Sequence, residues 1–219
     1  MSATLISYSQ PFTKIDNITK NTVIDLIAFC ARVSNPANQH NTENNEQLLR
    51  YLIKNNHWSP LEMVNICLEI ETTRDIARQI LRHRSFSFQE FSQRYAVTDL
   101  DFEIREARLQ DTKNRQNSIE TNDTELKERW DSLQVEVSNL VKHAYSWAID
   151  SGIAKEQARV ILPEGMTRSR LYMSGTLRSW VHYIQLRTGN GTQKEHQQIA
   201  LACVDAIEPI FPMIREFSQ

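Results

Sequence analysis

Residues 62–95 read EMVNICLEIETTRDIARQILRHRSFSFQEFSQRY, and this stretch decides the fold class. Every second position from Val64 to Ile70 is apolar, with mostly polar residues between. A period of two over that length predicts a half-buried strand over residues 62–72. At Thr73 the period changes to that of an amphipathic helix, so a strand leads directly into a helix.

Three arginines form a stripe along this helix, because Arg74, Arg78 and Arg82 recur at every fourth position. Like charges at this spacing repel one another. The stripe therefore predicts that something anionic meets it.

The segment after the helix concentrates side chains that could bind a large anionic ligand. Arg82, His83 and Arg84 are consecutive, so they cannot share one helix face and should project as a fan. The chain should then become extended, which would place Ser92 and Arg94 on the same side. A hydroxyl and a guanidinium on one side would suit a phosphate group. From the residues alone, the alternative is a charged surface loop.

The charge of the chain is unevenly distributed. Residues 74–94 carry a net charge of +3 and residues 159–187 carry +4, all from arginine, with no lysine in either segment. Since the whole chain carries −2, the rest of it carries −9. Arginine differs from lysine where a planar fork must bind a carboxylate or phosphate. This pattern predicts a site for anionic, phosphorylated ligands, with salt-bridged helix faces as the open alternative.

The remaining segments predict a helix-rich α+β fold with a mostly antiparallel sheet. Residues 3–8 predict an edge strand and residues 166–173 alternate like another strand. Helices are predicted after Asn21, over residues 42–54, 125–151 and 155–162, and from Thr176 to Arg187. A last helix is predicted to end at Ile207, and Thr192 and Glu195 indicate a capping box at its start.

The longest helix, over residues 125–151, is predicted to bury an apolar stripe and to stop at Gly152. The stripe consists of Leu126, Trp130, Leu133, Val137, Leu140, Val141 and Ala144. Residues 111–123 are polar and without period, which predicts a surface loop within a domain. No linker or repeat interrupts the chain, so we expect a single domain over residues 1–219.

The composition is that of a globular protein, with 219 residues, 40% hydrophobic and 24% charged. No apolar run reaches the roughly 18 residues of a membrane span, and residues 1–11 have no signal-peptide pattern. We therefore expect a cytoplasmic chain without a membrane partner.

Three cysteines, Cys30, Cys67 and Cys203, each stand among apolar neighbours. No C-x-x-C spacing occurs, so no metal or redox site is predicted. These thiols are expected to act as small hydrophobic side chains.

The arrangement Arg82-His83-Arg84, seven residues, Ser92, one residue and Arg94 resembles the signature of the flavin-dependent thymidylate synthases. The resemblance extends over about residues 26–205. Similar segments are Ala31-Arg32-Val33-Ser34, His57-Trp58-Ser59-Pro60-Leu61-Glu62, Ala77-Arg78-Gln79, Ala158-Arg159, Leu162-Pro163, Leu177-Arg178-Ser179-Trp180 and Leu186-Arg187.

The resemblance implies reductive methylation of dUMP to dTMP. The family takes the carbon from 5,10-methylenetetrahydrofolate, and NADPH reduces FAD, which supplies the hydride. No cysteine nucleophile is needed. The resemblance also implies an α+β fold and a homotetramer with sites where subunits meet.

Site residues also follow from the resemblance. It implies that FAD is bound by Ser59, Arg82, His83, Arg84, Glu90, Thr176, Leu177, Arg178 and His182, with His57 near the flavin ring. It implies that dUMP is bound by Gln79, Ile80, Leu81, Arg82, Glu90, Phe91, Ser92, Gln93, Arg94, Arg159 and Arg187.

Two of these arginines have distinct implied roles. Arg94 would bind the phosphate. Arg187 would lie against the uracil and act in catalysis, because a cation there favours ionisation of ring N3 and raises electron density at C5. Ser92 is expected to position a ligand, since no His/Asp relay is readable for a nucleophile.

The chain departs from the family pattern in one helix. The family often has Asn-Ala-Arg where this chain has Thr176-Leu177-Arg178, and Asn where it has His182; one inserted residue precedes Thr176. Gln89 replaces an Asn before the glutamate of the signature. On residue type alone, His182 and His196 read as surface or satisfied core residues.

Two other functions compete with this one. Arginines interleaved with Phe86, Phe88, Phe91 and Tyr95 would suit single-stranded nucleic acid, although the pI of about 6.3 and the missing lysines argue against it. A flavoprotein with another substrate is the second alternative; a dinucleotide-binding Rossmann domain is excluded, because G-x-G-x-x-G is absent.

Overall fold

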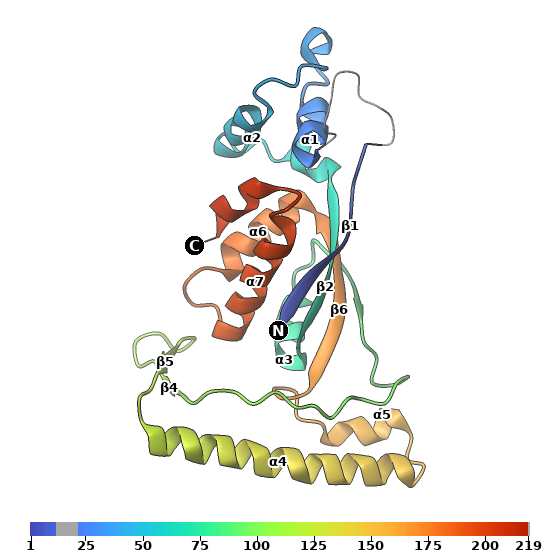
Figure 1. Ribbon diagram of the computed structural model, residues 1–219, viewed down its shortest axis with the longest axis vertical. Coiled ribbons are helices and arrows are strands. Elements are labelled where there is room, and N and C mark those ends of the chain that lie inside the picture. Colours follow the sequence, from blue (N-terminus) through green and yellow to red (C-terminus); the bar gives the residue numbers. More distant parts are fainter. Residues whose placement is uncertain (12–21, 219) are drawn as a thin grey trace.

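The computed structural model describes residues 1–11 and 22–218, and a four-stranded sheet runs through its middle (Figure 1). The strand order is β1-β2-β6-β3, and all neighbours are antiparallel. The strands are β1 Ser2–Tyr8, β2 Asn65–Thr73, β6 Arg168–Thr176 and β3 Ser87–Glu90. The predicted α+β class and the edge position of β1 are confirmed.

Helices cover one face of this sheet and extend from both of its ends (Figure 1). The α-helices are α1 Val23–Ala31, α2 Asn45–Lys54, α3 Arg74–Ile80, α4 Thr124–Asp150, α5 Lys155–Ala158, α6 Leu177–Arg187 and α7 Lys194–Ile207. Short 3-10 helices are η1 Pro36–Asn38, η2 Ser59–Met63, η3 Arg159–Ile161 and η4 Pro212–Phe217. Asn21, after which α1 was predicted, lies outside the described residues.

The core lies between the sheet and helices α6 and α7. Leu68 pairs with Met173 and Ile70 with Leu171, so these four side chains share one face, and all are fully buried. Trp180 of α6 packs against them within the same cluster. Each large apolar side chain buried in this way contributes about 1.5–3 kcal/mol.

Gly175 allows the chain after α3 to approach the sheet closely. A Cβ at Gly175 would collide with the ring of Phe86. That ring also packs edge-on against Trp180, with centroids 4.9 Å apart. Phe86 therefore anchors the turn that contains the Arg-His-Arg triplet against the core.

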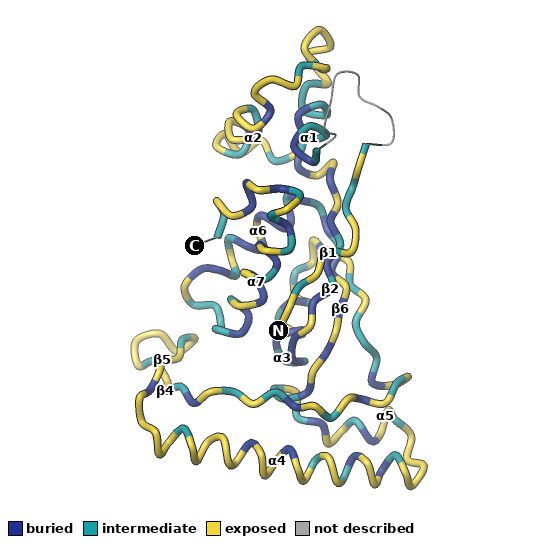
Figure 2. The backbone as a smooth tube through the Cα atoms, in the orientation of Figure 1, coloured by how far each residue is buried: buried dark blue, intermediate teal, exposed yellow. Residues whose placement is uncertain are grey.

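The stripe predicted for α4 is not its buried face. Leu126, Trp130, Leu133, Val137 and Leu140 are exposed, and Val141 and Ala144 are only partly buried. The buried residues are Gln134, Ser138, Tyr145 and Ala148, and Figure 2 shows most of α4 exposed.

The reason for this reversal is hydrogen bonding. Gln134 Oε1 accepts from the backbone N–H of Arg105 and its Nε2 donates to the Arg105 carbonyl, each at 2.9 Å. Tyr145 Oη accepts from Thr98 N at 3.2 Å. The inner face of α4 thus satisfies the backbone of an irregular segment. Trp130 Nε1 also donates to the Arg105 carbonyl, at 2.8 Å, whereas Leu133, Val137 and Leu140 face outward.

Residues 111–123 are not all loop, because β4 Arg108–Gln110 and β5 Ser118–Glu120 form an antiparallel hairpin. Lys194 Nζ lies 2.6 Å from Glu120 Oε1 and 2.8 Å from Glu106 Oε1. These ion pairs hold the hairpin against the first turn of α7.

The capping geometry agrees with two of three predicted helix ends. Gly152 has φ of +79° and stops α4 as predicted, and Thr176 Oγ1 accepts from Ser179 N to cap α6. The capping box before α7 is wrong. Gln193 precedes that helix without a capping bond, and Thr192 Oγ1 donates to the Leu186 carbonyl.

None of the helices in the described residues combines the length and apolarity that a membrane crossing requires.

Candidate active site

The arginine stripe of α3 is met by carboxylates of the same chain. Arg74 Nη1 lies 3.3 Å from Glu90 Oε1, and Arg78 pairs with Glu164. Ser169 Oγ donates to the same oxygen of Glu90 at 2.9 Å. The prediction that an anion faces the stripe is correct at these two positions, and the chain supplies it itself.

The turn after α3 presents two unpaired cations. Arg82 and Arg84 are exposed while His83 is half-buried, so the triplet fans out as predicted. Neither arginine makes an ion pair or side-chain hydrogen bond within the described ranges 1–11 and 22–218. Ile80 is fully buried and its carbonyl accepts from His83 N, so its side chain faces away from any ligand.

Arg187, at the end of α6, is held by the triplet. Its Nε donates to His83 Nε2 at 2.9 Å, and the His83 ring lies edge-on to Tyr183 with centroids 4.9 Å apart. Since Nε2 accepts this bond, His83 is neutral. Two terminal nitrogens of Arg187 remain for another partner.

Burial keeps two histidines in this region neutral. Burial, then the nearby charges of Arg187 and Arg82, lower the pKa of His83 to about 4. Burial, then Arg187 and His83, lower the pKa of His196 to about 3. Both lie below the ordinary value of 6.5, because an added charge would be desolvated and repelled.

The free energy of unfolding should therefore decrease as pH falls from 7.5 to 5. Below pH 6.5 His83 and His196 bind protons in the unfolded chain but not yet in the folded chain, so acid favours unfolding. Urea denaturation at the two pH values measures this. The His196→Asn variant removes one titrating group and should show a smaller difference. Equal stability of the wild type at pH 5 and 7.5 would contradict the prediction.

A second group of predicted residues surrounds η2 and the start of α6. The Trp58 ring lies 4.7 Å from the ring of His182, and Glu62 pairs with Arg178. Ser179 Oγ donates to the Ser85 carbonyl at 3.3 Å. These contacts bring the predicted flavin-contacting residues His57, Ser59, Arg84, Thr176, Leu177, Arg178 and His182 into one neighbourhood.

A third group surrounds a cavity of about 420 Å³ beside α3 and α5. Gln93 is 5% exposed, and its Nε2 has no hydrogen-bond partner. Arg159 lines the same cavity and makes no ion pair with another described residue. The full lining is Arg74, Arg78, Gln93, Glu156, Gln157, Arg159, Val160, Leu162 and Glu164.

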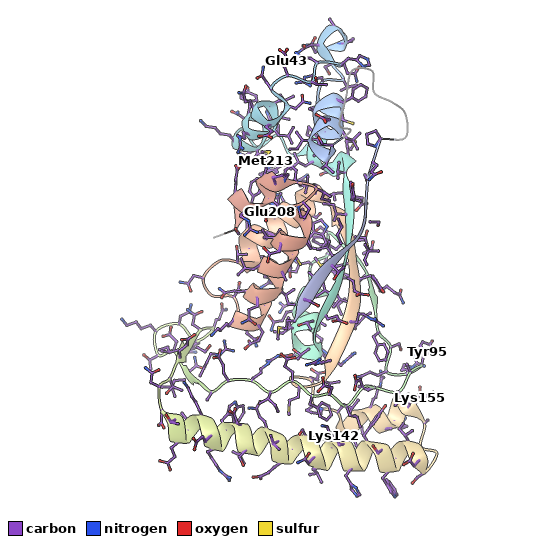
Figure 3. All side chains as sticks on the ribbon, in the orientation of Figure 1. Glu43, Tyr95, Lys142, Lys155, Glu208 and Met213 are labelled. Atoms are coloured by element: carbon purple, nitrogen blue, oxygen red, sulfur yellow. The ribbon has the colours of Figure 1, made fainter. Side chains whose placement is uncertain are left out.

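The predicted extended geometry of residues 92–95 is wrong. Tyr95 N and Ala96 N both donate to the Ser92 carbonyl, at 3.1 and 3.2 Å, so the chain turns here. Ser92 Oγ accepts from Arg94 N at 3.4 Å. The arginine side chain instead meets Glu156 Oε2 at 3.4 Å. Tyr95, 78% exposed, projects into solvent (Figure 3).

The first two groups adjoin through the Ser179–Ser85 hydrogen bond beside Arg84, whereas Arg94 is separate from Arg187. Gln79, His83 and Arg187 lie near the ends of α3 and α6. No hydrogen bond or ion pair among the described residues links them to Arg94. Glu90 belongs with the arginine stripe, and Phe91 N donates to the Arg170 carbonyl at the end of β3.

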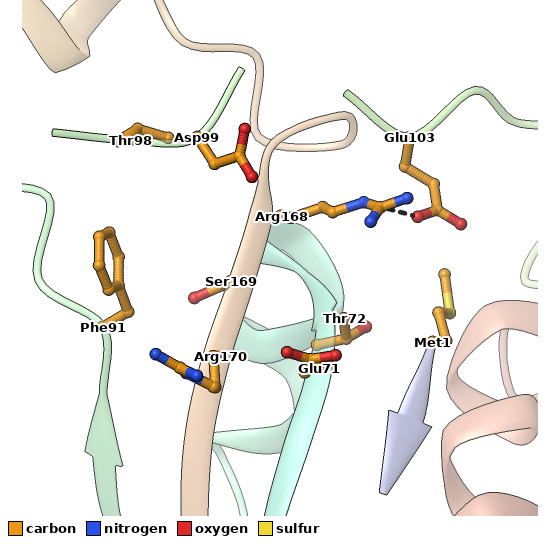
Figure 4. A pocket seen from close by; sticks show the side chains of 10 residues that line it. All are labelled: Met1, Glu71, Thr72, Phe91, Thr98, Asp99, Glu103, Arg168, Ser169 and Arg170. Carbon is orange, nitrogen blue, oxygen red and sulfur yellow. Dashed lines mark ion pairs between the residues drawn. The ribbon is translucent and has the colours of Figure 1, made fainter. Parts of the chain in front are cut away.

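A further pocket of about 320 Å³ lies at one end of the sheet, across strands β2 and β6 (Figure 4). Arg168 crosses it toward Glu103, with Nε 3.5 Å from Oε2. Among the predicted site residues, only Phe91 lines it. It is also smaller than the cavity of about 420 Å³ beside α3 and α5, which contains more of the predicted site residues.

No cysteine lies among these groups. Cys30 and Cys67 are half-buried and Cys203 is buried, and burial raises the pKa of all three thiols. Within the described part of the chain, no cluster of three or more His, Cys, Asp or Glu could hold a metal.

Comparison with known proteins identifies the family. A model of the family described as "Thymidylate synthase complementing protein" matches residues 18–213. The chain is 48% identical over 214 residues to a "Probable flavin-dependent thymidylate synthase" of Paramecium bursaria Chlorella virus 1, covering 98% of this chain and 97% of that protein. A "Flavin-dependent thymidylate synthase" of Synechocystis sp. matches with the same identity and coverage.

Solved structures show the same fold. A UMP/dUMP methylase PolB from Streptomyces cacaoi, bound with 5-Br dUMP, has a TM-score of 0.79 and 24% identity, covering 99% of this chain and 93% of that one. Its form with 5-Br UMP has a TM-score of 0.81 at 24% identity, covering 99% and 92%. The full-length matches at 48% identity confirm the resemblance carried by the signature, and the chain belongs to the flavin-dependent thymidylate synthase family.

Proposed function

We propose that this chain converts dUMP to dTMP, with 5,10-methylenetetrahydrofolate as carbon donor, NADPH as reductant and FAD as cofactor. One observation carries the proposal. Arg82, Arg84 and Arg159 have no carboxylate partner among the described residues, whereas Arg74 and Arg78 do. Unpaired guanidinium groups on a nucleotide-binding signature suit phosphate acceptors.

FAD fits the neighbourhood of the triplet. The free guanidinium groups of Arg82 and Arg84 suit its diphosphate, and we assign Ser59 of η2 and Arg178 and His182 of α6 to the same cofactor. We assign His83, Glu90, Thr176 and Leu177 to the same cofactor, with His57 near the ring. When bound, FAD transfers the hydride equivalent that NADPH delivers.

The nucleotide phosphate fits the cavity lined by Gln93 and Arg159. At about 420 Å³ it falls within the range of about 300–1,000 Å³ typical of ligand sites. The unpartnered Nε2 of Gln93 would donate a hydrogen bond to a bound anion, which would relieve the free-energy cost of burying this amide. Arg94 would exchange Glu156 for the phosphate. We assign Gln79, Leu81, Arg82, Glu90, Phe91, Ser92 and Arg187 to the rest of dUMP, and leave out Ile80 because it is fully buried.

Arg187 would act on the base. His83 holds its Nε, so the two terminal nitrogens are oriented and free. A half-buried cation beside uracil stabilises the ring ionised at N3, which raises electron density at C5. C5 would then form a bond to the methylene carbon as one bond of that carbon to a folate nitrogen breaks, and C5 would lose its proton.

We also propose a homotetramer with active sites between subunits. The exposed apolar side of α4, formed by Leu126, Trp130, Leu133, Val137 and Leu140, resembles an interface rather than a solvent face. Arg187 and Arg94, which no hydrogen bond or ion pair of the described residues connects, would meet across such contacts. A single domain over residues 1–219 and a cytoplasmic location are part of this proposal.

The nucleic-acid alternative is disfavoured by the positions of the aromatic residues. Phe86 is 9% exposed, and Phe88 packs against the core. Side chains held in this way cannot act as stacking platforms for successive bases. Of the four aromatic residues that this alternative needs, Tyr95 is the one that is fully exposed.

A turnover assay tests the proposal. The FAD-loaded protein should form dTMP from dUMP, methylenetetrahydrofolate and NADPH, and it should oxidise NADPH faster when dUMP is present. Unchanged flavin absorbance and fluorescence at saturating FAD would contradict the cofactor assignment. Flavin binding without dTMP formation would favour a flavoprotein with another substrate.

Simultaneous replacement of Cys30, Cys67 and Cys203 by Ala should leave turnover per folded molecule within about threefold of the wild type, since all three lie outside the site groups. Loss of the buried Cys203 thiol should lower the melting temperature by creating a small cavity. The measurement is kcat normalised to bound FAD. Loss of turnover with FAD still bound would show that a thiol takes part.

A further inference from the structure

A series of partly buried hydrogen bonds starts on α6, passes through His196 of α7 to α3 and ends on α7 at Glu195. Tyr183 Oη lies 3.1 Å from His196 Nε2, and His196 Nδ1 lies 3.2 Å from Gln79 Oε1. Gln79 Nε2 donates to Gln193 Oε1 at 2.8 Å, and Gln193 Nε2 donates to Glu195 Oε2 at 2.8 Å. Arg108 of the β4–β5 hairpin pairs with this carboxylate.

All hydrogen bonds of this series have the same donor-to-acceptor direction, from Tyr183 toward Glu195. Gln79 Oε1 can only accept, so His196 Nδ1 carries the proton. Since His196 is neutral, its Nε2 must accept from the Tyr183 hydroxyl. The carboxylate of Glu195 accepts at the far end, which defines the direction of every bond before it.

Burial makes this arrangement costly unless each group is paired. His196 is 0% exposed and Glu195 6% exposed, although both belong to a helix that otherwise packs through apolar residues. A buried imidazole or carboxylate that loses its partner costs about 1–3 kcal/mol or more. An apolar residue at either position would avoid that cost, so the pairing serves something beyond packing.

Within this series of hydrogen bonds, the Gln79 amide is the group that keeps free hydrogen-bonding positions for a ligand. Two of its hydrogen-bonding positions are used, one by His196 and one by Gln193. The orientation of the amide is therefore determined, with one N–H and one oxygen lone pair left for a ligand. Gln79 is half-buried, and it lies one turn before the Arg-His-Arg triplet.

We propose that His196 is a positioning residue, which sets the orientation of the Gln79 amide for the nucleotide. This inference rests on the proposed function, because it takes dUMP as the ligand of Gln79. His196 itself is fully buried and would not touch the nucleotide. The ion pair between Glu195 and Arg108 holds the other end of this series of hydrogen bonds against the β4–β5 hairpin.

A matched pair of substitutions separates positioning from packing. In His196→Asn the amide nitrogen takes the place of Nδ1, so the donor to Gln79 is kept and the contact with Tyr183 is lost. In His196→Gln the amide reaches the place of Nε2, so the contact with Tyr183 is kept and the donor is lost. Each variant loses one buried hydrogen bond, so both should lose similar stability.

Calorimetric titration of dUMP into the FAD-loaded, full-length protein is the measurement. We expect His196→Gln to raise the Kd of dUMP by about tenfold and His196→Asn by less than about threefold. In a Gln79→Ala background, the His196→Gln change should have no further effect on Kd, because the two residues act through one contact. The KM for dUMP should follow Kd, while kcat at saturating dUMP stays within about threefold.

The outcomes distinguish a failure of the positioning role of His196 from a failure of the proposed function. If both His196 variants bind dUMP equally well, or if His196→Gln still weakens binding in the Gln79→Ala background, the positioning role is wrong and the proposed function stands. If Gln79→Ala binds dUMP as the wild type does, Gln79 is not a nucleotide contact. That part of the proposed function then fails, and this inference fails with it.

Discussion

Arg187→Ala should lower kcat for dTMP formation by about 10²- to 10³-fold at saturating dUMP, the range seen when one charge-stabilising donor is removed. The guanidinium is half-buried and held by His83, so it is positioned before the substrate arrives. Negative charge on the uracil grows as N3 ionises. The contribution of Arg187 is therefore larger in the transition state than in the ground state, and the loss falls on kcat.

Two controls isolate this effect. Arg187→Lys keeps a cation without the Nε–His83 geometry and should recover part of the rate. The transfer of electrons from NADPH to FAD without dUMP should change much less, provided that the flavin spectrum shows the cofactor still bound. If Arg187→Ala changed only the KM for dUMP, the catalytic role of Arg187 would be wrong.

Arg94→Ala should raise the KM for dUMP by roughly 10- to 150-fold, since a charged hydrogen bond contributes about 1.5–3 kcal/mol. The phosphate does not change during the reaction, so Arg94 binds ground state and transition state alike, and kcat should remain nearly constant. Arg94→Lys should also weaken binding, because a point charge cannot reproduce a bidentate contact. Steady-state kinetics with varied dUMP measures both variants.

Glu156 offers the matched control for Arg94. Their ion pair, at 3.4 Å, joins side chains that are 57% and 50% exposed, so it contributes little to stability. Glu156→Gln frees Arg94 and should leave the KM for dUMP unchanged or lower it by a few-fold. If Arg94→Ala abolished kcat with KM intact while Arg187→Ala changed only KM, the phosphate and base ends would be reversed.

Much of the fold follows from local patterns. The change of period near Thr73 marks the step from β2 to α3, and the turn at Gly152 ends α4 where a left-handed residue is needed. Thr176 caps α6 through its own side chain. These features depend on residues within one or two turns of each other, so a single sequence contains the information.

The errors have two causes, a distant segment that needs polar groups of a helix and a local turn that replaces an extended segment. The apolar stripe of α4 points outward, because Gln134 is needed by the backbone of Arg105. Ser92 and Arg94 lie on a turn, because the Ser92 carbonyl is taken by the amides of the next residues. A periodicity rule assumes that the apolar face of a helix is the buried one, and it fails where polar side chains of the inner face must bond the backbone of another segment.

The sequence by itself determined the α+β class, the family and the residue types that meet anions, because these depend on short-range periods and on a signature within residues 82–94. Only the tertiary structure decided which polar groups work together. Arg187 reaches His83 across 104 positions, and His196 reaches Gln79 across 117. A hydrogen bond is specified by distance and direction in space, and residues so far apart acquire both only when the sheet and helices α3, α6 and α7 have packed.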